Sequence, residues 1–145
     1  MTATPQSYAN HRRVFPLYHL FALPILIAHV AITLVGALRE PTLWTFWMVV
    51  VAVGLVAAVV ANRASTLIVQ NRVIGLEMRL RLATVLPVEL CQRIPELGIK
   101  QLVGLRYAGD AELTGLVERC LRGELPTADA VKRAVRQWRP DYVRA

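Results

Sequence analysis

Two long stretches without a charged residue, separated by only four residues, constrain this chain more than any other feature. The first covers residues 14–38 and the second residues 43–61, which makes 25 and 19 residues. A helix of about 20 apolar residues crosses a bilayer core of about 30 Å, so both stretches are long enough. A charge at mid-span costs about 2.5–3.5 kcal/mol, and neither stretch carries one. We therefore expect two transmembrane helices.

The connection between the stretches is residues 39–42, Arg39-Glu40-Pro41-Thr42. A loop this short forces the two helices to lie antiparallel and adjacent. Pro41 suits such a turn, because proline disfavours helix at the residue before it and can begin the next helix. Trp44 and Trp47 follow at one expected membrane interface, and Tyr18 is a candidate for the other.

Positive charge flanks the two stretches and is nearly absent between them. The chain has a net charge of +7, with Arg12 and Arg13 before the first stretch and most of the Lys and Arg after the second. The positive-inside rule places both termini in the cytoplasm. We expect an all-α membrane protein: a cytoplasmic segment (1–13), a transmembrane hairpin (14–38 and 43–61) with a periplasmic loop (39–42), and a small basic cytoplasmic helical domain (62–145).

Small residues recur at four-residue spacing in the second stretch, and prolines interrupt the first. The small residues are Gly54, Ala57, Ala58 and Ala61. Such spacing lets helix backbones approach closely, either the first span of the same chain or another membrane subunit. Pro24 removes a helix hydrogen bond and predicts a kink in the first span.

His19 and His29 are the ionisable side chains within the spans, and such residues suggest a function. Ten residues separate them by about 15 Å along a helix and leave their side chains roughly 80° apart, so one metal or haem cannot take both. The second stretch has no His, Cys, Asp or Glu. His29 alone is a candidate ligand for a bacteriochlorophyll-type pigment or haem; the alternative is a neutral histidine hydrogen-bonded between helices.

The second span is expected to continue as a helix to about Thr84. Apolar residues recur there at spacings of 4-3-4-3, as in a coiled coil: Val69, Val73, Leu76, Leu80 and Ala83. This seam predicts packing, either against the short helices that follow or against another protein. Glu77 lies four residues before Arg81, the favoured order for an ion pair on a helix.

Four shorter helices are expected after this point, over about 88–94, 99–107, 111–122 and 128–138. Asp110 and Thr127 are candidate N-caps for the last two, and Gly123 is expected to end the third. The third should bury Leu113, Leu116, Val117, Cys120 and Leu121 on one face. Cys91 and Cys120 are too few and too far apart for a disulfide scaffold.

Basic residues gather on the last predicted helix away from its apolar side: Lys132, Arg133, Arg136 and Arg139. Under a membrane, such residues can contact anionic lipid headgroups, worth about 1 kcal/mol each. Nucleic acid is not an expected partner, because aromatic residues do not alternate with the basic ones. The alternative is a solvated basic face.

Several segments resemble an uncharacterised family of small bacterial two-span membrane proteins. They are Tyr8-Ala9-Asn10-His11-Arg12-Arg13, Pro16-Leu17-Tyr18-His19, Gln70-Asn71-Arg72-Val73-Ile74, Leu76-Glu77-x-Arg79-Leu80-Arg81, Leu105-Arg106-Tyr107-Ala108 and Trp138-Arg139-Pro140-Asp141-Tyr142. The resemblance covers nearly the whole chain and implies the bacterial cytoplasmic (inner) membrane. It implies no mechanism.

No set of residues amounts to a catalytic or metal site, so we expect no enzyme activity. The expected function is that of an accessory or structural subunit of a larger inner-membrane complex, for example a photosynthetic or respiratory assembly. Its partners would be other membrane subunits and anionic lipid headgroups. The alternatives are a subunit that binds pigment or haem through His29, or a free-standing membrane protein that binds lipid surfaces.

Overall fold

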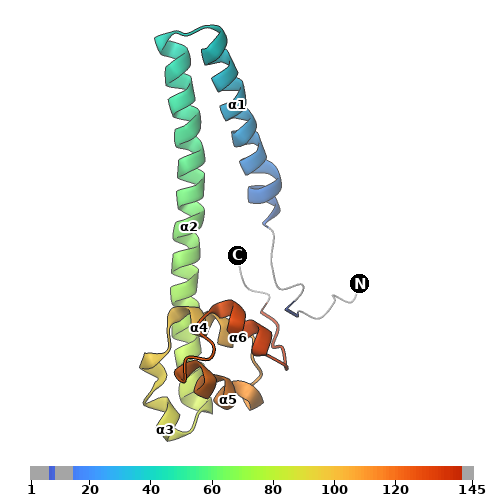
Figure 1. Cartoon of the computed structure of the whole chain (residues 1–145), viewed down its shortest axis with the longest axis vertical. Helices are drawn as coiled ribbons and strands as arrows, with labels where there is room; N and C mark the ends of the chain where they lie inside the picture. Colours follow the sequence, from blue (N-terminus) through green and yellow to red (C-terminus); the bar gives the residue numbers. More distant parts are fainter. Residues whose placement is uncertain (1–6, 9–14, 142–145) are drawn as a thin grey trace. The chain divides into compact units, whose positions relative to one another are not determined.

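The computed structural model of the chain describes residues 7, 8 and 15–141, and the elements among these residues are all helices, with no strand. The elements are η1 (Leu17–Ala22), α1 (Leu23–Arg39), α2 (Leu43–Val85), α3 (Val88–Cys91), η2 (Ile94–Glu96), α4 (Ile99–Leu105), α5 (Asp110–Leu121) and α6 (Ala128–Ala134) (Figure 1). They fall into two compact units, residues 13–67 and residues 68–145 with the N-terminal segment. We call the first the hairpin and the second the domain.

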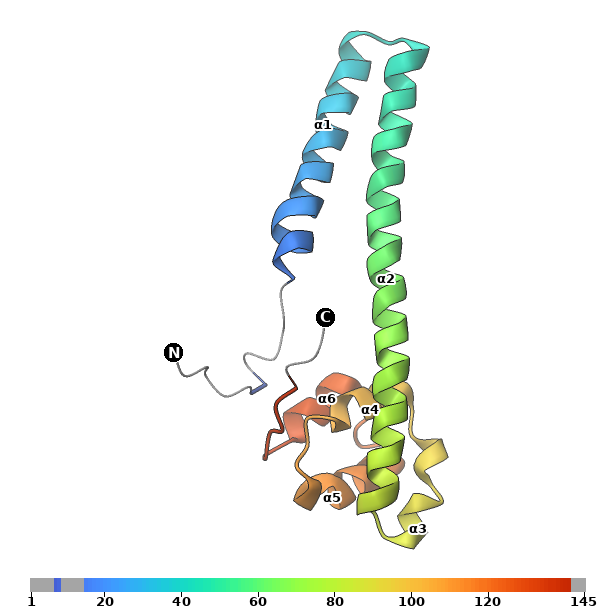
Figure 2. The same cartoon turned by 180° about the vertical axis from the view of Figure 1, so that it is seen from behind.

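The hairpin contains α1 and the first part of α2, which run antiparallel (Figure 2). Residue 14 of the first predicted span lies outside the described residues and residue 15 is not helical; the rest of both predicted spans is helical, and each helix is long and apolar enough to cross a membrane. Residues 40–42 connect them. Thr42 caps α2: its Oγ1 accepts a hydrogen bond from the Thr45 N–H at 3.2 Å, and Thr45 Oγ1 accepts one from the Thr42 N–H at 3.0 Å. This reciprocal pair satisfies two backbone donors at the helix start.

The first predicted span contains a change of helix type at its proline. Residues 17–22 form the π-helix η1, and Pro24 lies in the first turn of α1. Proline has no N–H, so Pro24 cannot donate the usual helical hydrogen bond to the carbonyl four residues earlier. The residues before it form the i→i+5 hydrogen bonds of a π-helix instead of i→i+4 bonds. The kink that was expected at Pro24 stays a prediction, and the structure places the π-helix just before this proline.

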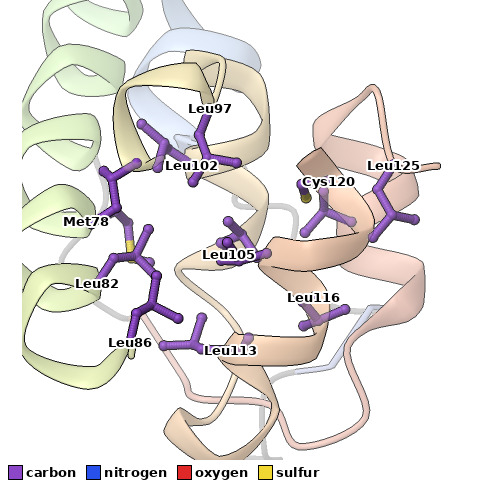
Figure 3. Packing of buried hydrophobic residues seen from close by; sticks show 14 of the residues in the cluster. Met78, Leu82, Leu86, Leu97, Leu102, Leu105, Leu113, Leu116, Cys120 and Leu125 are labelled. Atoms are coloured by element: carbon purple, nitrogen blue, oxygen red, sulfur yellow. The ribbon is translucent and has the colours of Figure 1, made fainter. Parts of the chain in front are cut away.

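The domain is built on one face of α2. Ile74, Met78 and Leu82 follow one another at four-residue spacing and are all buried, with Leu82 fully so. They belong to one buried cluster with residues of α4 and α5, including Leu102, Leu105, Leu113, Leu116 and Cys120; in Figure 3, Leu113 lies beside Leu86 of the α2 side, whereas Leu116 and Cys120 lie on the side of Leu125. Burial of such side chains, about 1.5–3 kcal/mol for each, is the main stabilising contribution to the domain.

The predicted seam of α2 is on the other side of the helix. Val69, Val73, Leu76 and Leu80 are 60%, 48%, 61% and 72% exposed, and Ala83 is exposed as well. The expectation that this seam packs against the following short helices was therefore wrong. The reason is that α2 carries two apolar faces, and the domain uses the one through Ile74 and Met78.

The helix ends of the domain agree with the sequence in some places and differ in others. Thr127 caps α6, its Oγ1 accepting from the Ala130 N–H at 3.1 Å, and α5 is followed by Gly123 at φ +79°, as expected. The N-cap of α5 is Gly109 rather than Asp110, because Asp110 binds Arg81 instead. Helix α6 ends at Ala134, four residues earlier than predicted.

The segment after α6 is extended because it is bound to the start of α5. Glu112 accepts the backbone N–H groups of Arg136 at 3.0 Å and Gln137 at 3.1 Å. A short bridge then pairs Ala108 with Trp138, and the Arg139 N–H donates to the Tyr107 carbonyl at 2.8 Å. These bonds replace the helical ones that the sequence pattern had suggested.

Candidate functional site

An open cavity of about 440 Å³ in the domain is lined by charged side chains from three separate segments. Helix α2 contributes Ile74, Glu77, Met78 and Arg81, the end of α4 contributes Arg106, and the extended segment contributes Arg139, Pro140 and Asp141. We call it the arginine cavity. All three segments are among those that carry the sequence resemblance described above.

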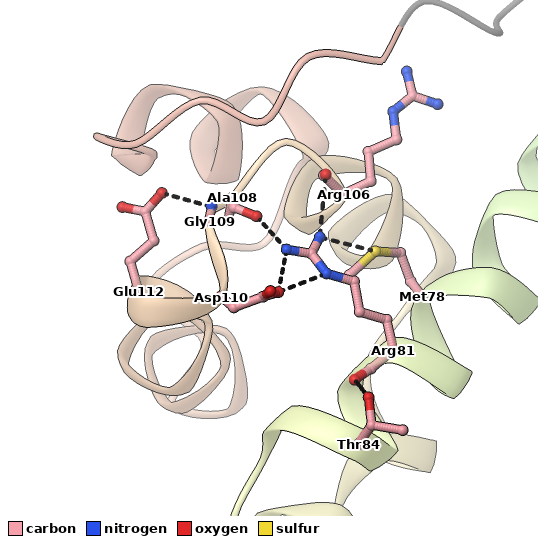
Figure 4. Close-up of polar contacts among 8 residues, drawn as sticks. All are labelled: Met78, Arg81, Thr84, Arg106, Ala108, Gly109, Asp110 and Glu112. Carbon is pink, nitrogen blue, oxygen red and sulfur yellow. Dashed lines mark hydrogen bonds and ion pairs between the residues drawn. The ribbon is translucent and has the colours of Figure 1, made fainter.

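Arg81 closes one side of the arginine cavity and is fully engaged (Figure 4). Its Nη2 donates to the Ala108 carbonyl at 2.7 Å and to Asp110 Oδ1 at 2.5 Å, and its Nε donates to the same oxygen at 2.9 Å. The helix pair that was expected between Glu77 and Arg81 is absent. Arg81 is a structural residue that fixes α2 to the start of α5.

Arg106 is the buried charge of the arginine cavity. Its side chain is 6% exposed, and its Nη2 donates to the Tyr107 hydroxyl. Asp141 lies 3.4 Å from Arg106 Nε, an ion pair without hydrogen-bond geometry. Neither Nε nor Nη1 makes a hydrogen bond with a residue that the structure describes. Buried donors left unpaired cost about 1–3 kcal/mol each, so this guanidinium favours an added acceptor.

The arginine side chains around the cavity differ in how far carboxylates neutralise them. Arg81 is balanced by Asp110 and Arg106 faces Asp141, while Arg139 is exposed and has no ion-pair partner among the described residues. Arg139 and the open donors of Arg106 are suited to a phosphate or carboxylate, which guanidinium groups bind through parallel N–H donors. Glu77 also lines the cavity, and its negative charge would repel a bound phosphate or carboxylate.

The four basic residues predicted from the last helix do not share one face. Lys132 lies 5.5 Å from the centre of the Tyr107 ring, and Arg139 lines the arginine cavity. Arg133 binds Asp129 at 3.0 Å and donates to the hydroxyl of Tyr8 at 2.9 Å, and Arg136 is exposed. Since Tyr8 comes from the N-terminal segment, Arg133 connects the two ends of the chain.

Tyr8 and Asp129 form a contact that sequence reasoning missed. The Tyr8 hydroxyl donates to Asp129 Oδ1 at 2.8 Å. This hydrogen bond, followed by the nearby Arg133 and Lys132, lowers the pKa of Asp129 below its usual range. The separation of 121 residues along the chain means that no local pattern could have indicated it.

The residues singled out in the hairpin are mostly exposed. Trp44 and Trp47 are 69% and 56% exposed, and Tyr18 is half-buried with Arg63 over its ring at 5.9 Å. The small residues Gly54, Ala57, Ala58 and Ala61 are all exposed, whereas Ala37 and Ala52 are buried in the hairpin. Helix α1 of the same chain therefore does not cover the small-residue face.

The two histidines of the first span stand apart from each other. His19 is exposed, and its Nδ1 lies 3.0 Å from the Phe15 carbonyl and 3.2 Å from the Phe15 nitrogen. His29 is half-buried. No group of three or more His, Cys, Asp or Glu side chains that could hold a metal ion occurs in residues 7, 8 and 15–141. A pigment or haem at His29 would thus depend on that single imidazole and its apolar neighbours.

Comparison with known proteins identifies a family. No curated protein and no solved structure matches the chain. A family of unknown function, DUF6526, matches residues 1–145. The chain therefore belongs to this family, over its whole length.

Proposed function

We propose that this protein is a two-span protein of the bacterial inner membrane with both termini in the cytoplasm, acting as a non-catalytic accessory subunit of a larger membrane complex. It would contribute packing surface within the bilayer through the hairpin and a docking surface outside it through the domain. Photosynthetic and respiratory assemblies are examples of such complexes.

The observation that carries this proposal is the exposure of the apolar helices. In the most apolar window of each helix, only 6% of the residues are buried. An apolar helix in the core of a soluble protein would have most of its residues covered, and the second helix lies too far from the N-terminus for a signal sequence. Lipid is the solvent in which such a surface is stable.

The small-residue face supports a role in assembly. A Cβ atom added at Gly54 would meet no atom within 4 Å, so the backbone of α2 is open to close approach there. Ala57, Ala58 and Ala61 continue the same open surface. Helices in membranes associate through small residues of this kind, and a second membrane subunit is the partner that fits.

The arginine cavity supports a second candidate function, binding at an anionic lipid surface. Positively charged groups near the cytoplasmic leaflet are attracted to anionic headgroups by about 1 kcal/mol each. Among the described residues, Arg106 Nη1 has no hydrogen-bond acceptor, Arg106 Nε has the ion pair with Asp141 but no hydrogen bond, and Arg139 carries an exposed guanidinium. On this proposal the chain would function without a protein complex.

Purification of the full chain from native membranes in mild detergent, with a C-terminal affinity tag and mass spectrometry, distinguishes these functions. A membrane subunit recovered in constant ratio to the chain is the expected result. Recovery of this chain alone would overturn the accessory role and leave lipid binding. Release of the chain from membranes by sodium carbonate would overturn the two-span topology and with it the accessory role within the bilayer, and would leave binding at a lipid surface. Visible absorbance lost in His29→Ala would instead favour a pigment or haem subunit.

A further inference from the structure

The exposed seam of α2 has the spacing of a helix that pairs with a second helix. Val73 and Leu80 occupy the positions called a in a heptad, and Val69, Leu76 and Ala83 those called d. Four of these side chains are 48–72% exposed. An apolar row of this kind, repeated every three and four residues, is a contact surface whose partner is missing.

The domain of the same chain cannot cover this seam. Residues advance by 100° around a helix, so the buried face through Ile74, Met78 and Leu82 lies roughly 180° from the seam through Val73 and Leu76. Since α4 and α5 already pack on the buried face, the seam points away from them. Its partner must be another molecule.

Lipid is a poor partner for the seam because charged residues flank it. Arg72 and Arg79 lie beside the a positions, and Glu77 lies beside a d position. Within a bilayer core, each would cost several kcal/mol. A protein helix outside the membrane is compatible with all three.

The charges flanking the seam match a second copy of this chain. In a parallel two-stranded coiled coil, a residue at position g faces the residue five places later, at position e, of the other helix. Arg72 is at g and Glu77 is at the following e. Both are exposed, and neither forms an ion pair with a residue that the structure describes. Two copies would therefore form two Arg72–Glu77 pairs by symmetry.

We propose that the exposed seam of α2 is a homodimer interface, at which the seams of two copies pack in parallel and in register over residues 69–83. This inference rests on the proposed function in one respect: two copies inserted with the same topology present parallel helices. Two heptads are short for a free coiled coil, but confinement to one membrane raises the effective concentration of the second copy.

Disulfide crosslinking in membranes tests the interface position by position. The parent is the full chain with Cys91→Ser; Cys120 stays, because it is buried. Single cysteines at Val73, Leu76 and Leu80 should form, under copper-phenanthroline oxidation, a dimer of twice the 16.2 kDa chain mass. The matched control is Ile68→Cys, equally exposed at 62% but about 100° from the seam. We expect at least tenfold less dimer there.

Exchanging the charges of Arg72 and Glu77 tests the identity of the partner. Both side chains are exposed, so the substitutions leave the buried core of the domain unchanged. Arg72→Glu and Glu77→Arg should each lower the Leu76→Cys crosslink about tenfold, because like charges then face each other. The double exchange should restore it. Restoration is expected only where both partners carry the same two substitutions, that is, between copies of this chain.

Three results would overturn the inference: equal crosslinking at Ile68, no dimer at any seam position, or a crosslink to a different protein identified by mass spectrometry. The last of these would leave the accessory role intact. Conversely, seam dimers with no other subunit recovered would support the homodimer and overturn the accessory role, so the two proposals fail separately.

Discussion

Arg81 on α2 donates two hydrogen bonds to a single oxygen of Asp110, at 2.9 Å from Nε and 2.5 Å from Nη2, and so connects the long helix to the first residue of α5. The Arg81 side chain is 16% exposed, whereas that of Asp110 is 59% exposed. The two ends of this ion pair should therefore contribute unequally to stability. Arg81 also donates to the Ala108 carbonyl, which Asp110 does not.

The first prediction is that Arg81→Ala destabilises the domain by about 2–3 kcal/mol, since a buried carbonyl and a carboxylate both lose a charged donor. Asp110→Ala should cost about 0.5–1 kcal/mol, because its carboxylate is largely solvated. The measurement is the rate at which a thiol reagent labels Cys120 in the Cys91→Ser full chain in mild detergent. Equal effects of the two substitutions would contradict this account of the pair.

The second prediction concerns Cys120, which is 4% exposed in the domain core. Burial raises its pKa to about 11 from the ordinary 9.0, an effect that nearby Arg119 partly offsets. The folded state thus holds the thiol proton more tightly than the unfolded state. Below pH 9 the resulting stabilisation, on the order of 2–3 kcal/mol, is fully present, and it is lost as the pH rises through 11.

Thermal unfolding of the full chain at pH 8 and at pH 11 measures this effect. The Cys120→Ala chain is the control, because it lacks the thiol and so the linked proton. The parent should lose more stability than Cys120→Ala between the two pH values. Parallel losses in both chains would show that the thiol does not titrate in this range in the folded domain.

The third prediction compares two glycines. A Cβ atom at Gly104 on α4 would lie 2.6 Å from Val131 Cβ and 3.0 Å from the backbone oxygen of Ala128 on α6. Gly104→Ala should therefore force α4 and α6 apart and cost about 1–3 kcal/mol. Gly115 on α5 has no atom within 4 Å of such a Cβ. Gly115→Ala should stabilise the domain by about 0.5–1 kcal/mol through helix propensity.

Labelling of Cys120 reports both glycine substitutions in the same background. The double substitution Gly104→Ala with Val131→Gly gives the decisive control, because it removes both the Cβ and the Cγ1 atom of Val131 that the added Cβ would meet. The double substitution should lose less protection than the two single substitutions lose together. A Gly104→Ala chain as protected as Gly115→Ala would mean that the two helices are not in close contact.

The fourth prediction concerns Glu112, whose carboxylate accepts the backbone N–H groups of Gly109, Arg136 and Gln137. These bonds fix the extended segment that brings Arg139 and Asp141 to the arginine cavity. Glu112→Ala should release the segment at a cost of about 1–2 kcal/mol, on the scale of charged hydrogen bonds at a partly exposed site. Glu112→Gln retains one acceptor oxygen and should have an intermediate effect.

Limited trypsin digestion measures this release, with the products identified by mass spectrometry. Cleavage after Arg136 should rise about tenfold in Glu112→Ala, in proportion to the open population. Cleavage after Arg122 serves as the internal control, because that residue directly follows α5 and contacts Glu124 rather than Glu112. A parallel rise at both sites would indicate general unfolding instead.

Local sequence patterns predicted much of the fold. The two apolar helices, the continuation of α2 to Val85, the Thr127 cap and the buried face of α5 all follow from spacing and helix-end chemistry within a few residues. Membership in the family was likewise indicated by short segments along the whole chain. These features share one property: the residues that determine them are close in sequence.

The arginine cavity could not be predicted in the same way. Arg81 and Arg106 are 25 residues apart in the sequence. Asp141 follows a segment that was predicted to be helical to residue 138, whereas α6 ends at Ala134 and the segment after it is extended. The helix spacing paired Arg81 with Glu77, and no local pattern indicated a role for Arg106. Arg106 is buried where the end of α4 meets residues of α2 and the last segment, and that segment is held there by Glu112, by the Ala108–Trp138 bridge and by the bond from the Arg139 N–H to the Tyr107 carbonyl.

By itself, the sequence determined that α2 is a single long helix and that its second half carries apolar residues on two faces. It did not determine which face is covered. Val73 and Leu76 belong to one row, and Ile74 and Met78 belong to the other. Helix periodicity places each row on a face of α2 but does not indicate which face is buried. In the tertiary structure, residues of α4 and α5 form one buried cluster with the row through Ile74 and Met78. The row through Val73 and Leu76 therefore remains exposed and available to a second molecule.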